Sequence, residues 1–107
     1  MEAVEKSLGQ IKILLGEAHY NQGFFNIRQT FSNMFGKDRS LIFIQLGDNS
    51  EIIEGYINRT ANPNKTPRIM IGNTYTNWIQ KNYVKGDILT IELFTNRKIK
   101  LHPKIKK

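Results

Sequence analysis

Residues 41–57 have the sequence LIFIQLGDNSEIIEGYI. Two apolar runs flank the polar segment from Gly47 to Ser50, and this arrangement is typical of two strands joined by a turn. The acidic residues Glu51 and Glu54 are compatible with a strand that is buried on only one face. The segment therefore predicts a β-hairpin and a fold that is built mainly from strands.

Shorter apolar runs of the same kind predict five more strands, at residues 11–15, 23–25, 68–71, 88–94 and 98–101. Two other segments have helical spacing. In residues 27–35 the apolar side chains recur on one helical face, with Asn26 placed to cap the helix and Gly36 to end it. A second face forms around Trp78, after a possible cap at Thr76. We expect a mainly β (α+β) fold with seven strands and two short helices.

The length of 107 residues and the apolar content of 39% fit one domain with one core. The chain has no cysteine, no secretory start and no apolar run of the roughly 18 residues that cross a membrane. We expect a cytoplasmic protein, monomeric as an isolated domain. Its folded part is predicted at residues 1–101, and residues 102–107 are expected to be a basic tail or the start of a linker.

The positive charge is unevenly distributed. The formal net charge is +7, but six basic residues and no acidic ones lie in the last eleven positions. Without these six, ten basic residues face nine acidic ones, so the net charge of the rest is +1. Within that rest, residues 55–86 contain five Lys or Arg, six Asn and no acidic residue. Since Lys and Arg bind phosphates, and Arg and Asn can read base edges, this stretch predicts a nucleic-acid-binding surface.

Two segments resemble a known family of DNA-binding domains. Residues 24–31, FFNIRQTF, resemble the strand-to-helix segment of the plant B-three transcription-factor domain. Residues 76–87, TNWIQKNYVKGD, resemble the Thr, Trp, Asn and Gly-Asp segment of that family, as found in the effector domains of bacterial restriction endonucleases. Asn26 and Gln29 replace the proline and the second lysine of the plant pattern, and this favours the restriction-enzyme branch.

The resemblance implies a seven-stranded open pseudobarrel that grips the DNA major groove with two arms. The first arm would be residues 17–23, and the second would be residues 58–68. The predicted DNA-binding residues in and beside these arms are His19, Tyr20, Asn21, Gln22, Arg28, Gln29, Asn58, Arg59, Asn62, Asn64, Lys65 and Arg68. The resemblance also implies double-stranded DNA as the partner, with a nuclease or motor domain or subunit elsewhere in the restriction system.

Several of these residues also have a purely structural interpretation. Asn62 and Asn64 flank a proline as in an ordinary tight turn, where Asn side chains bond to their own backbone. An arginine at a strand end is commonly only solvated, and His19 could be a DNA contact or a satisfied loop residue. Trp78 is assigned to the core rather than to base stacking.

The sequence does not favour catalysis. It has only two histidines, His19 and His102, and no glycine-rich phosphate loop, so no local motif for a triad, a zinc site or a nucleotide site is present. Asp87 and Glu92 lack the apolar-then-Lys pattern of a metal nuclease. We therefore expect a non-catalytic recognition domain without a metal or a cofactor.

Two alternatives remain open at this point. The first is a single-stranded RNA or DNA binder that stacks bases on Tyr20, Phe24, Phe25 or Tyr56, which requires these aromatic side chains to be exposed on one sheet. The second is a protein-interaction domain that docks a partner along the edge of the hairpin in residues 41–57.

Overall fold

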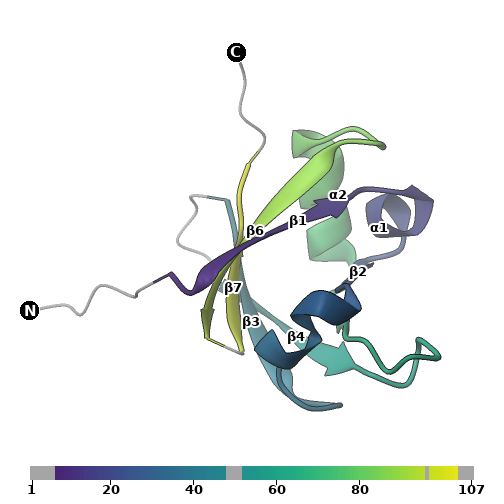
Figure 1. The fold of residues 1–107 in the computed structure, drawn as a ribbon. Coiled ribbons are helices and arrows are strands. Elements are labelled where there is room, and N and C mark those ends of the chain that lie inside the picture. Colours follow the sequence, from purple (N-terminus) through teal and green to yellow (C-terminus); the bar gives the residue numbers. More distant parts are fainter. Residues whose placement is uncertain (1–6, 48–51, 96, 104–107) are drawn as a thin grey trace, which may run out of the picture.

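A single sheet of seven strands, curled into a half-barrel, is the framework of the computed structural model (Figure 1). The structure describes residues 7–47, 52–95 and 97–103. The strands are β1 (Gly9–Leu14), β2 (Phe24–Asn26), β3 (Leu41–Leu46), β4 (Ile52–Asn58), β5 (Arg68–Met70), β6 (Ile88–Thr95) and β7 (Lys98–Leu101). The helices are α1 (Glu17–Asn21), the 3-10 helix η1 (Gln29–Met34) and α2 (Asn73–Asn82). The predicted mainly β fold with seven strands is confirmed.

The strands lie in the order β1-β6-β7-β3-β4-β5-β2. All neighbours are antiparallel except β3 and β7, which pair in parallel with Ile44 opposite Ile99. The β3–β4 hairpin is present, with Ile44 opposite Ile53. Both hairpin strands have a second neighbour, β7 or β5, so the predicted docking along the hairpin edge is wrong. Within the part of the chain that the structure describes, the sheet edges are β1 and β2.

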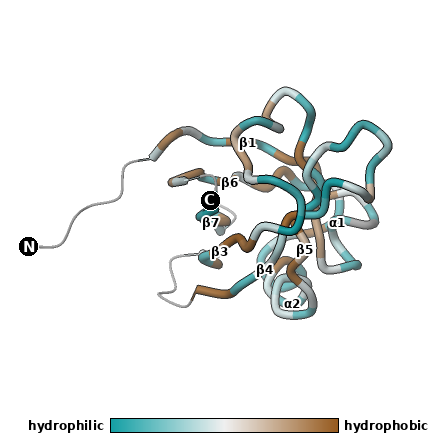
Figure 2. Tube along the Cα trace, turned by 90° about the horizontal axis from the view of Figure 1, so that it is seen from below, coloured by the Kyte–Doolittle hydropathy of each residue, from teal (hydrophilic) through white to brown (hydrophobic). Residues whose placement is uncertain are grey.

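One face of the sheet carries the core. Side chains that alternate along the strands are fully buried there, including Leu89, Ile91 and Leu93 on β6 and Ile99 on β7. Each such side chain contributes about 1.5–3 kcal/mol through its removal from water. Figure 2 shows the same division, with hydrophobic residues concentrated in the strands and hydrophilic residues in most of the connecting segments.

Helix α2 begins one turn earlier than predicted. Its N-cap is Gly72, at φ +105°, and Thr76 lies inside the helix. The start of the helix is set by packing. Tyr75, which precedes Thr76, is fully buried together with Ile79 one turn later, so the apolar face of the helix begins before Thr76. Trp78 is partly buried against the core, 6.1 Å from the ring of Tyr83.

The helix predicted at residues 27–35 forms only as η1, and its predicted cap is wrong. Asn26 belongs to β2, and the backbone stays extended through Arg28, whose side chain makes no cap hydrogen bond. The reason is that the Ile27 amide still donates to the carbonyl of Pro67, at 2.8 Å, which continues the strand pairing past Asn26. Gly36 follows the C-cap Phe35.

The segment expected to form the first arm, residues 17–23, contains helix α1, so the described residues form three short helices and not two. The Tyr20 amide donates to the carbonyl of Gly16 at 3.0 Å and closes the first turn. The chain turns at Gly86 into β6, with the Val84 amide bonded to the Asp87 carboxylate at 2.9 Å.

The hairpin turn after Gly47, Glu51, the turn residue Asn96 and the basic residues from Lys104 onward lie outside the described residues. His102, which was expected to belong to the tail, is bonded to the folded domain. Its amide donates to the Thr90 carbonyl at 3.0 Å, and its ring lies 2.9 Å from the Glu92 carboxylate. None of the described helices is long and apolar enough to cross a membrane.

Candidate nucleic-acid interface

The two predicted arms project from the same side of the half-barrel (Figure 1). We define the first arm as residues 17–23, which contain α1, and the second arm as residues 58–68, which connect β4 to β5. Strand β2 lies beside the second arm because Asn26 pairs with Arg68, and Arg68 pairs with Asn58. The sheet therefore brings residues that are distant in the sequence to one edge.

The first arm is held against α2 by three side chains. The Tyr75 hydroxyl donates to the His19 carbonyl at 2.7 Å, and burial raises the pKa of this hydroxyl, which keeps it protonated. The Tyr20 hydroxyl donates to the Tyr83 carbonyl at 3.3 Å. The Gln80 amide donates to the Tyr20 carbonyl and to the Asn21 side chain. Tyr20 and Asn21 thus have contacts within the protein, while Gln22 is exposed.

The ring of His19 is held on both sides. Its Nδ1 lies 3.2 Å from the Leu14 carbonyl, and its Nε2 accepts the Asn26 amide at 3.2 Å, which fixes the neutral tautomer with the proton on Nδ1. Burial lowers the pKa of His19, the bond to Leu14 opposes this, and the nearby charge of Arg68 lowers the pKa further. His19 is therefore neutral at pH 7.

Asn26 joins the two arms. Its Nδ2 lies 3.2 Å from His19 Nε2 in the first arm. Its Oδ1 accepts hydrogen bonds from Asn62 Nδ2 and from Arg68 Nε in the second arm, both at 3.0 Å. The sequence interpretation assigned Asn26 only as a helix cap and missed this role, because the signal is the pairing of β2 with β5 and not a local motif.

Arg68 is held by its neighbours on one side and is open on the other. The central carbon of its guanidinium lies 4.1 Å above the centre of the Phe24 ring, within the range of a cation–π contact. Its Nη2 lies 3.4 Å from Asn62 Oδ1, which is a long hydrogen bond. Its Nη1 has no hydrogen-bond partner among the residues that the structure describes. Arg68 therefore retains donors for a ligand.

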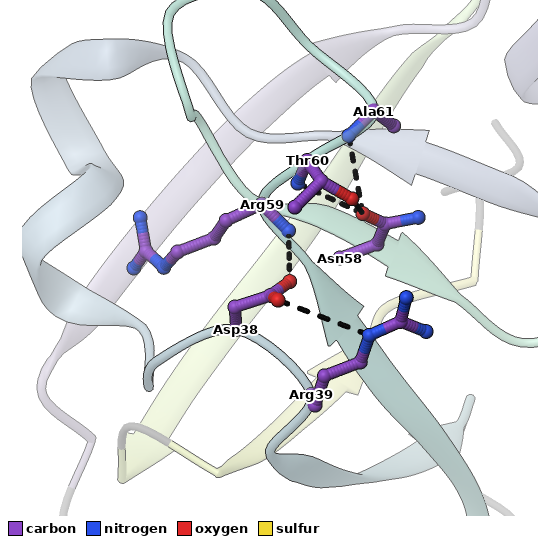
Figure 3. A network of polar contacts seen from close by, with 6 residues as sticks. All are labelled: Asp38, Arg39, Asn58, Arg59, Thr60 and Ala61. Carbon is purple, nitrogen blue, oxygen red and sulfur yellow. Dashed lines mark hydrogen bonds and ion pairs between the residues drawn. The ribbon is translucent and has the colours of Figure 1, made fainter.

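Arg59, at the other end of the second arm, uses all five of its guanidinium N–H donors within the protein. Nε donates to Gly36 O at 2.9 Å, Nη1 to Ser32 Oγ and Lys65 O, and Nη2 to the carbonyls of Ser32 and Phe35. Figure 3 shows its side chain extending away from Asp38 and Asn58. Arg59 ties the second arm to the end of η1, and a base contact would require these bonds to break.

The backbone of the second arm is fixed by its own polar side chains. Asn58 Oδ1 accepts the amides of Thr60 and Ala61 at 2.9 and 3.1 Å, and Asp38 accepts the amide of Arg59 at 2.7 Å (Figure 3). Asn64 Oδ1 accepts the Thr66 hydroxyl at 2.8 Å. Asn58 and Asn64 therefore shape the loop, and for Asn64 this agrees with the structural interpretation of the turn around Pro63.

The remaining predicted residues point to solvent. Arg28, Gln29 and Lys65 are exposed, and Lys65 has a left-handed backbone at φ +60°. Two shallow hollows flank Asn26 next to these side chains. One, of about 420 Å³, is lined by Asn26, Asn62, Pro63, Asn64 and Thr66, and the other, of about 230 Å³, by Ile13, Leu14, His19, Asn26, Ile27 and Arg28. The first hollow is lined by amide and hydroxyl side chains around Pro63, which can hydrogen-bond to a polar ligand, whereas the second includes Ile13, Leu14 and Ile27 and is mainly apolar.

The aromatic side chains do not form an exposed stacking platform. Phe25 is fully buried, and Phe24 is only 7% exposed, with one ring face covered by Arg68. Tyr20 is packed against the core, and Tyr56 is partly buried beneath Arg39. The exposure that the single-stranded alternative requires is absent at these four residues.

No group of three or more His, Asp or Glu side chains that could hold a metal occurs among the described residues. Glu92 is hydrogen-bonded to Ser7 and His102, and these bonds lower the pKa of its carboxylate. A further hollow of about 400 Å³, around Leu41, Tyr56 and Met70, lies outside the Asn26 network and has a mostly apolar lining.

Comparison with known proteins gives a fold likeness alone. No protein-family model matches the chain, and no curated protein matches it. Among solved structures, the N-terminal domain of Helicobacter pylori LlaJI.R1 is similar, with a TM-score of 0.64 and 14% identity. The similarity covers 90% of this chain and 79% of that chain. At this level of identity, the two domains share an architecture.

Proposed function

We propose that this chain is a sequence-specific, double-stranded DNA-binding domain that grips the major groove with its two arms. The observation that carries the proposal is the Asn26 network. It connects His19 of the first arm to Asn62 and Arg68 of the second arm, and it leaves Arg68 donors open beside the exposed Arg28 and Lys65. A surface with positive charge, amide groups and an open guanidinium suits both phosphates and base edges.

The proposal divides the site residues into three roles. Arg28 and Lys65 would contact phosphates, because both side chains are exposed and charged. Arg68 and Gln22 would contact base edges. Arg59 was predicted to contact a base. We instead assign it to holding the second arm against the end of η1, because all five of its guanidinium donors are already bonded within the protein.

The biological setting is a restriction system. The likeness to the LlaJI.R1 domain, which comes from a restriction-system protein, and the resemblance of residues 76–87 to restriction-enzyme effector domains point in the same direction. The domain would select the target, and a nuclease or motor part elsewhere in the system would act on it. We propose no catalytic activity, metal or cofactor for this chain.

A selection of bound duplexes from a randomised pool tests the proposal. We expect one enriched sequence, and an affinity for it that falls steeply with salt. A single module making about four to six phosphate contacts gives a log–log slope of roughly 4 to 5. Duplex affinity that does not depend on salt, or a pool without enrichment, would contradict sequence-specific binding. Cleavage by the purified chain in magnesium would contradict the non-catalytic assignment.

One observation favours a second candidate function, a protein-interaction surface. Leu41, Phe43 and Ile52 are 49%, 38% and 47% exposed and lie on one face of the adjacent strands β3 and β4. Contiguous exposed apolar side chains often mark a protein contact. The absence of binding to any nucleic acid at low salt would favour this function over DNA recognition.

A further inference from the structure

Arg68 is held by strand β2, which belongs to neither arm. Phe24 and Asn26 are two residues apart on β2 and lie opposite Met70 and Arg68 of β5. Their side chains therefore share one face of the sheet. The Phe24 ring lies beneath the guanidinium, with its centre 4.1 Å from Cζ, and Asn26 accepts the Nε–H at 3.0 Å.

These two contacts restrict the guanidinium in different ways. A ring beneath a planar cation fixes the plane in which the cation lies, and a hydrogen bond to Nε fixes its rotation within that plane. An arginine that is oriented before binding loses less side-chain freedom when a ligand arrives. The support from β2 therefore favours a specific, directional contact over a general electrostatic one.

The donors that remain define the ligand. Nη1 has no hydrogen-bond partner among the described residues, and Nη2 makes only the long bond to Asn62. These two nitrogens together form a fork of two donors. In the major groove, guanine presents two adjacent acceptors, O6 and N7, whereas adenine presents one acceptor next to a donor. The fork matches guanine.

We propose that Phe24 and Asn26 are positioning residues that orient Arg68 to read one guanine of the target. The inference rests on the proposed function, since it requires a duplex with a preferred sequence. It adds a base identity at one position and two specificity determinants that lie outside both arms.

The first experiment identifies the guanine. Each guanine of the selected duplex is replaced in turn by 7-deazaguanine, which lacks the N7 acceptor. We expect one position at which the replacement weakens binding, by less than the roughly 5- to 150-fold range for loss of a whole bidentate base contact, because O6 remains as an acceptor. In Arg68→Ala, the same replacement should cause no further loss. If the losses of binding free energy from Arg68→Ala and from 7-deazaguanine were additive at every guanine, Arg68 would not contact a guanine N7.

The second experiment tests the positioning residues through the ratio of affinities for the selected and a random duplex. Phe24→Leu and Asn26→Leu should lower this ratio by about tenfold, a value within the range for one base contact, because they weaken binding to the selected duplex more than binding to random DNA. Phe24→Tyr keeps an aromatic face and should preserve the ratio. Phe35→Leu is the matched control, because Phe35 is also buried, at 4% exposure, and no arginine of the described residues makes a cation–π contact with its ring.

The outcomes separate the inference from the proposed function. If the chain prefers one duplex but Phe24→Leu and Asn26→Leu keep the full preference, the positioning role is wrong and DNA recognition stands. If no duplex is preferred, both fall. If Phe24→Leu does not fold, Asn26→Leu still tests the positioning role. The 7-deazaguanine replacement should then weaken binding of Asn26→Leu less than binding of the wild type. An equal loss in both proteins would overturn the role.

Discussion

The two ends of the second arm carry the same residue type in opposite states. Arg59 leaves β4 and donates five hydrogen bonds to η1 and to the loop itself. Arg68 enters β5, lies over Phe24 and donates to Asn26 and Asn62. Arg59 thus has no donor left, whereas Arg68 has an open nitrogen.

The difference shows how one loop can be both rigid and able to bind. A guanidinium whose donors all bond to the protein stabilises the loop and is unavailable to a ligand. A guanidinium that is held by one face and one edge stays available. Four predictions, from the largest expected effect to the smallest, test this division.

The largest effect is expected on stability. Arg59→Ala should lower the free energy of unfolding by about 2–4 kcal/mol, because several carbonyls of η1 and the loop lose a charged donor at once. Arg68→Ala should lower the free energy of unfolding by about 1 kcal/mol. It loses one cation–π contact and two hydrogen bonds, to Asn26 and Asn62, that water can replace. Urea denaturation of both variants measures the difference. Equal losses would remove the distinction between the two ends.

The next effect is on recognition. Arg68→Lys keeps the charge but loses the fork, so the affinity for the selected duplex should fall by about 1–3 kcal/mol, while binding to random DNA stays unchanged. Arg59→Lys is the matched control, and its folded fraction should keep the wild-type preference. If fully folded Arg59→Lys lost the preference for the selected duplex over random DNA, Arg59 would have to be a base contact after all.

Acid should affect the Arg68 end first. Burial lowers the pKa of His19 from its ordinary 6.5, so between 6.5 and the lower folded value the unfolded state binds more protons than the folded one. The stability that neutral His19 contributes is complete above pH 6.5 and decreases as the pH falls through the folded pKa. The protonated ring also cannot accept the Asn26 amide, whereas the acceptors of the Arg59 guanidinium are backbone carbonyls and the Ser32 hydroxyl, which do not titrate.

Thermal melting across this pH range measures the effect. His19→Gln keeps an amide that can donate and accept, and it should have a smaller pH dependence of the melting temperature than the wild type. A wild type whose melting temperature rises on acidification through this range would contradict the sign of the effect.

The smallest effect is expected at Lys65, between the two arginines. Asn tolerates the left-handed backbone of this position, so Lys65→Asn should change stability by less than about 0.5 kcal/mol. It should weaken binding to every duplex alike and reduce the salt slope by about 1. Lys65→Arg, which keeps the charge, should keep the slope. An unchanged slope in Lys65→Asn would exclude a phosphate contact.

Most of the fold could be predicted from the sequence, because burial on one face of a strand imposes an alternation that is visible along the chain. The alternation of Leu89, Ile91 and Leu93 is one example. Helix α1 and the early start of α2 could not be predicted, because they depend on contacts between distant residues, chiefly the bond from the Tyr75 hydroxyl to the His19 carbonyl. The strand order could not be predicted either, because it depends on pairing between strands that are distant in the sequence.

The site was predictable as a region but not residue by residue. Composition selected residues 55–86, and the family resemblance selected residues 58–68 within them, which project beside the first arm in the structure. Neither could distinguish Arg59 from Arg68, since the difference arises from η1 on one side and β2 on the other. Asn26 was missed because its partners lie 7, 36 and 42 positions away in the sequence.

Strand β7, which follows all other described strands in the sequence, lies in the middle of the sheet between β6 and β3. Until residues 98–101 have left the ribosome, no strand pairing joins β1–β6 to β3–β4–β5–β2. The sheet is therefore completed only after β7 is available, through pairings between distant parts of the chain. During that interval β3 and β6 each have an unpaired side, and these temporary edges are where a nascent chain would pair with a neighbour and aggregate.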